Sequence, residues 1–289
     1  NYSPTKGKKE KVRQRDIVNV ITEKTGLSKT TISHHSSFSN FPKQMRSEIF
    51  GQDHNINIIH DSLSCAKVGL SDSTKPLSNF LFIGGTSVGK TFTAKKMAKY
   101  FYGNEKAFLQ LNMSEYQDKT GISKLIGANA GYIGYEEGGL LTEFVRNNPN
   151  CVVLFDEIEK CDPKILDILL HLLDEGYATD NLNRTIDFTN TIVIMTTNIG
   201  HEETGKRTLG FGPQNEDDGE IYRKSLKKYL RPELLSRIDE ILFFNKLKDK
   251  HLLKIVEQEL QHVQLRLRER NIDFKLSPTV KKFIFNQIK

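Results

Sequence analysis

The sequence has few cysteines, no long apolar run and no methionine at its start. Its three cysteines, Cys65, Cys151 and Cys161, form no C-x-x-C pair and leave an odd thiol over, which excludes a disulfide framework and is typical of reduced structural thiols. No run of 18 apolar residues is present to cross a bilayer, so a membrane-spanning protein is excluded. Residues 1–6 offer no apolar signal core, and we interpret the chain as a fragment or processed product.

Charge of one sign is only slightly in excess. The 289 residues include 42 Lys and Arg against 36 Asp and Glu, a net charge of +6, which would permit nucleic-acid binding. Much of the excess lies in residues 6–15 and in Arg266, Arg268 and Arg270, which we interpret as a solvated tail and helix face. Nucleic acid is therefore not the expected partner. The length allows roughly two domains with a real core, and 37% hydrophobic residues exclude a disordered chain.

Short apolar runs alternate with helical periodicity through the middle of the chain. A helix starts near residue 52, with Asp53 as its expected cap. The expected strands are 79–83, 107–111, 151–155 and 191–195, and the helices between them are 92–102, 139–147 and 163–174. Such alternation predicts an α/β fold with a parallel sheet flanked by helices. The predicted division is a basic tail and linker helix over 1–42, a large subdomain over 43–247 and a small helical lid, cut short, over 248–289.

A phosphate-binding loop follows the first strand directly and opens a helix. It reads Gly84-Gly85-Thr86-Ser87-Val88-Gly89-Lys90-Thr91 and satisfies G-x-x-x-x-G-K-[ST]. Backbone N–H groups at a helix start cradle phosphate oxygens, and glycines admit the close approach. Lys90 would neutralise the β- and γ-phosphates, and Thr91 would reach Mg²⁺. The loop predicts binding of ATP with Mg²⁺.

Two adjacent carboxylates end the strand 151–155. Asp156 can hold Mg²⁺ through its waters, and Glu157 can activate the attacking water. The alternative is that both acids only begin the next helix, because acids suit helix amino termini. Asp162 and Pro163 already supply a cap and a first-turn proline for that helix, which favours catalysis.

Two further polar residues follow in the order that ATP hydrolysis needs. Asn198 comes just past the strand 191–195, where it could bind the γ-phosphate and the attacking water; alone it would be a turn residue. Arg237 could supply a guanidinium that stabilises phosphoryl-transfer charge. The alternative for Arg237 is a surface salt bridge to Asp239 or Glu240.

With these elements in place, the chain resembles the Clp family of AAA+ protein unfoldases, specifically their second ATPase module, from about residue 44 to 247. Besides the motifs above, the resemblance rests on Gly127-Ala128-Asn129-Ala130-Gly131-Tyr132-Ile133-Gly134-Tyr135-Glu136-Glu137-Gly138-Gly139 and Asp187-Phe188-Thr189-Asn190-Thr191-Ile192-Val193-Ile194-Met195-Thr196.

The resemblance implies a ring-shaped, usually hexameric, ATP-driven machine. In such a ring, Lys90 and Thr91 would be the Walker A pair, Asp156 and Glu157 Walker B and Asn198 sensor 1, while Arg237 would act on the ATP of the neighbouring subunit. Ile49 and Phe50 would cover adenine.

Two loops of the resemblance point to polypeptide as substrate. Gly131-Tyr132-Ile133-Gly134 resembles the pore loop that grips a chain in the ring's channel, since glycines let a loop move and an aromatic holds any sequence; the alternative is an ordinary turn. Leu209-Gly210-Phe211, in the long loop 200–220, resembles the loop with which ClpC, ClpA and ClpX relatives dock on a ClpP-type protease ring. Alternatively, Phe211 packs on its own domain.

The predicted function is therefore an ATP hydrolase that unfolds and translocates polypeptides, similar to ClpC. The phosphate loop departs from the family at two positions, with Gly85 where members usually have proline and Ser87 where they usually have glycine. Two alternatives stay open: a non-hydrolysing ring subunit or scaffold, and a nucleic-acid-handling AAA+ ATPase. Abundant Lys, Asn and Ile suggest an AT-rich genome and a plastid, with a bacterial cytoplasm as the alternative.

Overall fold

The computed structural model describes residues 38–128, 138–199 and 228–273. It also describes residues 13, 16, 17, 19, 20, 226, 280, 283–285 and 287. Most of the predicted tail 1–42, the predicted pore loop Gly131–Gly134 and the predicted docking loop Leu209–Phe211 lie outside these residues. Within the described part of the chain, no helix is both long enough and apolar enough to span a membrane.

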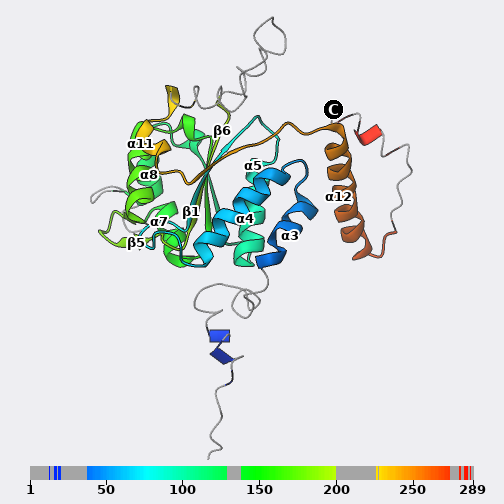
Figure 1. The fold of residues 1–289 in the computed structure, drawn as a ribbon, viewed down its shortest axis with the longest axis horizontal. Coiled ribbons are helices and arrows are strands. Elements are labelled where there is room, and N and C mark those ends of the chain that lie inside the picture. Colours follow the sequence, from blue (N-terminus) through cyan, green and yellow to red (C-terminus); the bar gives the residue numbers. More distant parts are fainter. Residues whose placement is uncertain are drawn as a thin grey trace, which may run out of the picture.

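Five of the described strands form one parallel sheet, which confirms the predicted α/β fold (Figure 1). The strands are β1 (Ser78–Ile83), β2 (Phe108–Asn112), β3 (Val152–Asp156), β6 (Ile192–Thr197) and β7 (Glu240–Phe243), in the order β2-β3-β6-β1-β7. Every residue of β1 and β6 is buried, as expected for central strands covered on both faces.

Helices cover both faces of this sheet (Figure 1). On one side lie α3 (Phe41–Glu48), α4 (Asp53–Lys67) and α5 (Lys90–Met97), and on the other α7 (Leu140–Asn147), α8 (Pro163–Glu175) and α11 (Pro232–Leu235). Further helical elements are η1 (Phe38–Asn40), η2 (Ala98–Tyr102), η3 (Met113–Glu115), α6 (Lys119–Ile126) and η5 (Ile158–Lys160). The predicted strands and helices match described elements to within a few residues, whereas β7, α3, α6 and α11 were not predicted.

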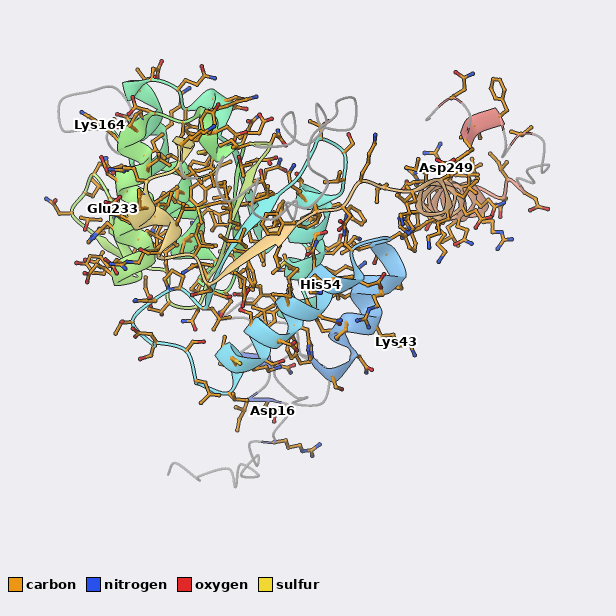
Figure 2. All side chains as sticks on the ribbon, turned by 45° about the horizontal axis from the view of Figure 1, so that its top comes forward. Asp16, Lys43, His54, Lys164, Glu233 and Asp249 are labelled. Carbon is orange, nitrogen blue, oxygen red and sulfur yellow. The ribbon has the colours of Figure 1, made fainter. Side chains whose placement is uncertain are left out.

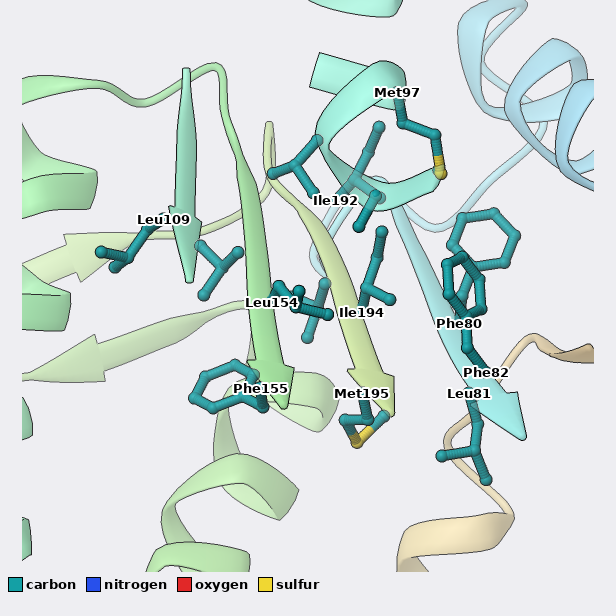
Figure 3. Packing of buried hydrophobic residues seen from close by; sticks show 14 of the residues in the cluster. Phe80, Leu81, Phe82, Met97, Leu109, Leu154, Phe155, Ile192, Ile194 and Met195 are labelled. Atoms are coloured by element: carbon teal, nitrogen blue, oxygen red, sulfur yellow. The ribbon is translucent and has the colours of Figure 1, made fainter. Parts of the chain in front are cut away.

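Large apolar side chains from β1, β3 and β6 make the core of the sheet. Figure 3 shows Phe80 and Phe82 on β1, Leu154 on β3 and Ile194 on β6 with Met97 of α5, and all five are fully buried. Burying one side chain of this size stabilises the fold by about 1.5–3 kcal/mol. The sheet is therefore a rigid base for the residues that follow its strands.

The two predicted helix caps have different outcomes. The predicted cap of α8 is confirmed, because Asp162 Oδ1 accepts a hydrogen bond from Lys164 N at 2.8 Å and Pro163 is the first helical residue. The predicted cap of α4 is wrong, since Asp53 is already inside the helix and Gln52 holds the cap position without a side-chain capping bond. An acid in the first turn still suits the helix dipole, and the Gln52 side chain is engaged elsewhere.

A half-buried carboxylate ties α3 to the helix that follows the phosphate loop. Glu48, at the end of α3, forms ion pairs with Lys96 and with Lys99, the latter at 3.1 Å, and accepts a hydrogen bond from the Tyr100 hydroxyl. Burial raises the pKa of Glu48, but these hydrogen bonds and the Lys96 charge outweigh it and hold the pKa at about 2. Glu48 is therefore an ionised link between two helices.

A small antiparallel hairpin joins the two segments that flank residues 129–137. Its strands are β4 (Tyr177–Thr179) and β5 (Thr185–Asp187). At its tip, Asn181 N donates to Ile126 O at 3.0 Å and Asn181 Nδ2 to Ala128 O at 2.8 Å. Arg184 pairs with Glu143 of α7 and with Asp180, the latter at 2.6 Å. The tip thus binds the chain on both sides of 129–137.

The last long helix, α12 (Asp249–Arg268), follows β7 and lies to one side of the sheet (Figure 1). In Figure 2, Asp249 at its start lies across the molecule from Lys164 of α8 and Glu233 of α11. Val256 is its buried residue. This helix confirms the predicted helical character of the chain after residue 247.

Candidate nucleotide-binding site

The predicted phosphate-loop residues gather with Asp156, Glu157 and Asn198 in one cleft at the carboxyl ends of β1, β3 and β6. Because the three strands are parallel, the residues that follow them meet at the same edge of the sheet. The cleft has a volume of 450 Å³. It is lined by residues 85–92 of the phosphate loop and α5, with Asn112, Asp156, Glu157 and Asn198.

The side chain of Lys90 is held inside this cleft. Lys90 begins α5 and is 8% exposed. Its Nζ donates to Gly84 O at 2.5 Å, to Gly85 O at 2.8 Å and to Asn198 Oδ1 at 2.7 Å. Burial lowers the pKa of Lys90, and the carboxylates of nearby acids act against this. Each of the three N–H donors of the ammonium group thus has an acceptor. Phosphate oxygens of a bound nucleotide could take the place of these acceptors.

The backbone of the phosphate loop takes two left-handed conformations near its helix. Gly89, the cap position of α5, has φ of 99°, which suits glycine. Ser87 has φ of 61°, a conformation that costs a non-glycine residue about 1–2 kcal/mol. Ser87 therefore holds a backbone conformation that favours glycine.

Oxygen ligands suited to a magnesium ion stand beside Lys90. The Thr91 hydroxyl donates to Asp156 Oδ2 at 3.3 Å, so the two predicted metal ligands are neighbours. Hydroxyl and carboxylate oxygens are the donors that Mg²⁺ prefers, usually together with water and substrate phosphates. No cluster of three or more His, Cys, Asp or Glu able to hold a metal occurs among the described residues.

Glu157 is held at both carboxylate oxygens. Oε1 accepts from Asn198 Nδ2 at 3.1 Å, and Oε2 accepts from Lys160 Nζ at 2.7 Å. Its backbone is left-handed, with φ of 60°, an unusual conformation that clusters at functional sites. Glu157 stands before η5 but makes no capping bond, and Asp162 caps α8. Glu157 therefore does more than begin the next helix, because Asn198 and Lys160 hold both oxygens of its side chain.

Several residues that sequence reasoning missed support these acids. Gln110 of β2 donates to Asp156 Oδ2 at 2.9 Å, and the Thr196 hydroxyl donates to Asp156 Oδ1. Glu159 Oε1 accepts from the backbone N of Asn198 at 3.1 Å. The strand register could have indicated Gln110. It is a polar residue two positions before Asn112, and Asn112 pairs with Asp156 of β3.

Arg237 lies at the opposite end of the sheet from the cleft. It precedes β7, and it lines a separate cleft with Ser78 and Asn79 at the start of β1. Its Nε lies 2.8 Å from Asp174 Oδ1 of α8, and its Nη2 donates to Asp174 Oδ2 at 3.0 Å. The alternative of a salt bridge is confirmed, but its predicted partners Asp239 and Glu240 are wrong, because α8 packs against α11 and brings Asp174 to the guanidinium.

Ile49 and Phe50, the predicted adenine contacts, are not among the residues that line the cleft. Ile49 is buried in the core. Phe50 is half-buried, and Lys254 Nζ of α12 lies 5.6 Å from its ring centroid. Their role in covering adenine stays a prediction.

Comparison with known proteins bears on the whole arrangement. The sequence matches the family described as the AAA domain (Cdc48 subfamily) over residues 75–241. The chain belongs to this family of AAA+ ATPase modules. Residues 247–288 match the C-terminal, D2-small domain of ClpB protein. The match confirms the predicted α-helical lid as the second part of the fold.

Relatives of more than one Clp kind are similar to this AAA+ module. The chaperone protein ClpB of Prochlorococcus marinus is 40% identical over 276 residues, which cover 94% of this chain and 32% of the relative. A ClpA homolog, an ATP-binding subunit of Clp protease from Cyanidium caldarium, is 38% identical over 287 residues, covering 96% and 34%. The predicted Clp resemblance is thus confirmed, without singling out ClpC.

A solved structure shares the fold. The closed-state cryo-EM reconstruction of Hsp104 with ATPγS and FITC casein superposes with a TM-score of 0.81 at 33% identity, over 95% of this chain and 48% of the other. The chain spans about a third of the length of the curated relatives named above, 32% and 34%.

Proposed function

We propose that this chain is the ATP-hydrolysing module of a ring-shaped machine that remodels polypeptides. The observation that carries the proposal is the convergence of Lys90, Thr91, Asp156, Glu157 and Asn198 on one cleft. The relatives named ClpB and the casein-containing Hsp104 structure support polypeptide as the substrate class. The presence of Glu157 and Asn198 in the cleft argues against the alternative of a non-hydrolysing scaffold.

The arrangement suggests how each side chain would act on ATP. The β- and γ-phosphates would lie on the N–H groups of the loop and at the start of α5, where Lys90 neutralises their charge. Thr91 and Asp156 would hold Mg²⁺, which when bound neutralises charge that develops on the phosphate oxygens. Glu157 would take a proton from the attacking water, and Asn198, which touches both Lys90 and Glu157, would orient that water.

The test is phosphate release from ATP and Mg²⁺ over a series of protein concentrations, beside Glu157→Gln. We expect activity that rises per subunit with concentration and falls by at least about 100-fold in the variant, the loss typical of a missing general base. Glu175→Gln, a matched change at the exposed end of α8, should leave activity unchanged. Equal rates in wild type and Glu157→Gln at every concentration would refute hydrolysis by this site.

The position of Arg237 supports a role in trans. The guanidinium lies at the end of the sheet away from its own cleft, so it could reach only a phosphate bound by another copy. We propose a hexamer in which it does so. Arg237→Ala should remove the concentration-dependent part of the activity; a variant that keeps this part would contradict the trans arrangement.

Two finer proposals, the pore loop and the docking loop, concern residues outside the described part of the chain. Variants in the longer protein can test them. In the longer protein, Tyr132→Ala should spare ATP hydrolysis but stop threading of a tagged substrate, and unimpaired threading would contradict a pore loop. Phe211→Ala should abolish co-elution with a ClpP-type protease ring if Leu209–Phe211 docks there. Unchanged co-elution would favour a ClpB-like disaggregase. We also propose that the domain limits are 43–247 and 248–289. The proposed location is a plastid or a bacterial cytoplasm.

A further inference from the structure

Gln52 is a buried amide that contacts three separate parts of the chain. It lies immediately before α4 and is 1% exposed. Its Nε2 donates to Val88 O of the phosphate loop at 3.3 Å and to Asn245 O at 2.9 Å. Its Oε1 accepts from Asn245 N at 3.1 Å and from Asn55 Nδ2 at 3.2 Å. Both donors and the acceptor are therefore used, and the amide is fixed in one orientation.

Asn245 belongs to the connection between the sheet and α12. Phe244 N donates to Ile83 O at 2.7 Å and so extends the pairing of β7 with β1, and α12 begins at Asp249. Gln52 binds both the N–H and the C=O of Asn245, as a neighbouring strand would. The connection is thus held at the second residue after β7, just before the region that matches the D2-small domain begins at residue 247.

The phosphate loop and this connection also touch directly. A Cβ placed on Gly84 would lie 2.9 Å from Phe244 O, so the start of the loop packs against the connection without room for a side chain. A shift of the loop therefore cannot be absorbed by empty space between the two segments. The bond from Gln52 to Val88 O is the longest of its four and has room to tighten.

We propose that Gln52 is a positioning residue that couples nucleotide occupancy of the phosphate loop to the orientation of α12. Phosphate oxygens bind the N–H groups of such a loop, and the peptide groups that rotate to meet them carry their carbonyls with them. Because the Gln52 amide is rigid, a movement of the Val88 carbonyl shifts the two bonds to Asn245. This inference rests on the proposed binding of ATP by the loop.

Hydrogen exchange on the full 289-residue chain, with and without ATPγS and Mg²⁺, tests the coupling. In wild type, nucleotide should slow exchange of the amides in 244–251 by about tenfold, within the usual range of coupling between sites. In Gln52→Met, which has similar length and no polar group, protection of 84–92 by nucleotide should persist. Its response in 244–251 should fall below about twofold, because the bonds that carry it are gone.

Further variants keep the result interpretable. Gln52→Glu retains the acceptor for Asn245 N and loses both donors, so it should also uncouple the two segments if Gln52→Met folds poorly. Asn55→Ala removes the bonds of Asn55 Nδ2 to Phe243 O and to Gln52 Oε1, but it leaves the bonds of Gln52 to Val88 O and to Asn245, and should keep the response. A full response in both Gln52 variants, or a response lost equally in Asn55→Ala, overturns the proposal. Absence of nucleotide binding by wild type, scored against Lys90→Ala, would instead refute the proposed function.

Discussion

Replacing Glu48 by glutamine removes the charge that ties α3 to α5. The pKa of Glu48 falls from 4.5 to about 2 in the folded chain, and at about 1.36 kcal/mol per unit this corresponds to at most about 3.4 kcal/mol. The Glu48 side chain is 13% exposed, but its partner Lys99 is 37% exposed, so water screens part of this energy. We expect Glu48→Gln to lower the free energy of unfolding at neutral pH by about 2–3 kcal/mol.

The pH dependence has a definite sign. The folded-state pKa of Glu48 is lowered, so the ionised carboxylate stabilises the fold fully above pH 4.5 and loses this effect as the pH falls toward 2. Urea unfolding at neutral pH and at successively lower pH, with Glu48→Gln beside wild type, measures the difference. It should be constant above pH 4.5 and shrink below it, and thermal unfolding at neutral pH should shift by about 5–10 °C.

Glu105→Gln is the matched control, because Glu105 pairs with the same two lysines, at 3.6 Å from Lys96 and 3.3 Å from Lys99, but is 49% exposed. An exposed pair of this kind contributes about 0–1 kcal/mol. The reasoning would be refuted by a Glu48→Gln effect no larger than that of Glu105→Gln, or by a difference that does not shrink in acid.

Three other expectations concern single contacts. Ser87→Gly should stabilise the fold by up to about 1 kcal/mol, because glycine adopts the left-handed φ of 61° without the strain that serine has there. A lower melting temperature would contradict this. Asp174→Asn should reduce concentration-dependent ATP turnover as Arg237→Ala does, with under about 1 kcal/mol of stability lost, and additive losses in the double variant would show that the two act separately. Burial raises the pKa of the Cys151 thiol to about 12, so iodoacetamide should modify exposed Cys65 and leave Cys151 intact, as peptide mass spectrometry would reveal.

The central strands could be predicted because their sequence is locally consistent. Runs such as Phe80–Ile83 and Val152–Phe155 are uninterrupted and apolar, as strands buried on both faces must be. The edge strand β7 was missed because it is only four residues long and starts with Glu240. Asp53 was misplaced as a cap because an acid is equally favourable one position later, in the first turn.

The cleft was predictable for a related reason, since its residues directly follow predicted strands whose ends must coincide in a parallel sheet. Contacts between distant segments gave no local pattern. Gln52 and Asn245 are separated by 193 positions. The ion pair between Arg237 and Asp174 depends on how α8 packs against α11. Such pairings depend on tertiary packing, which neither hydrophobic periodicity nor motif spacing specifies.

The β4–β5 hairpin has a mechanical consequence. A pulling force on residues 129–137 enters the described structure at Ala128 on one side and at Gly138 on the other. On the first side it loads the two hydrogen bonds of Asn181 together, and through α7 it loads the ion pair of Glu143 with Arg184. Both paths end on the same short hairpin, so its tip would resist the separation of the two flanks under tension.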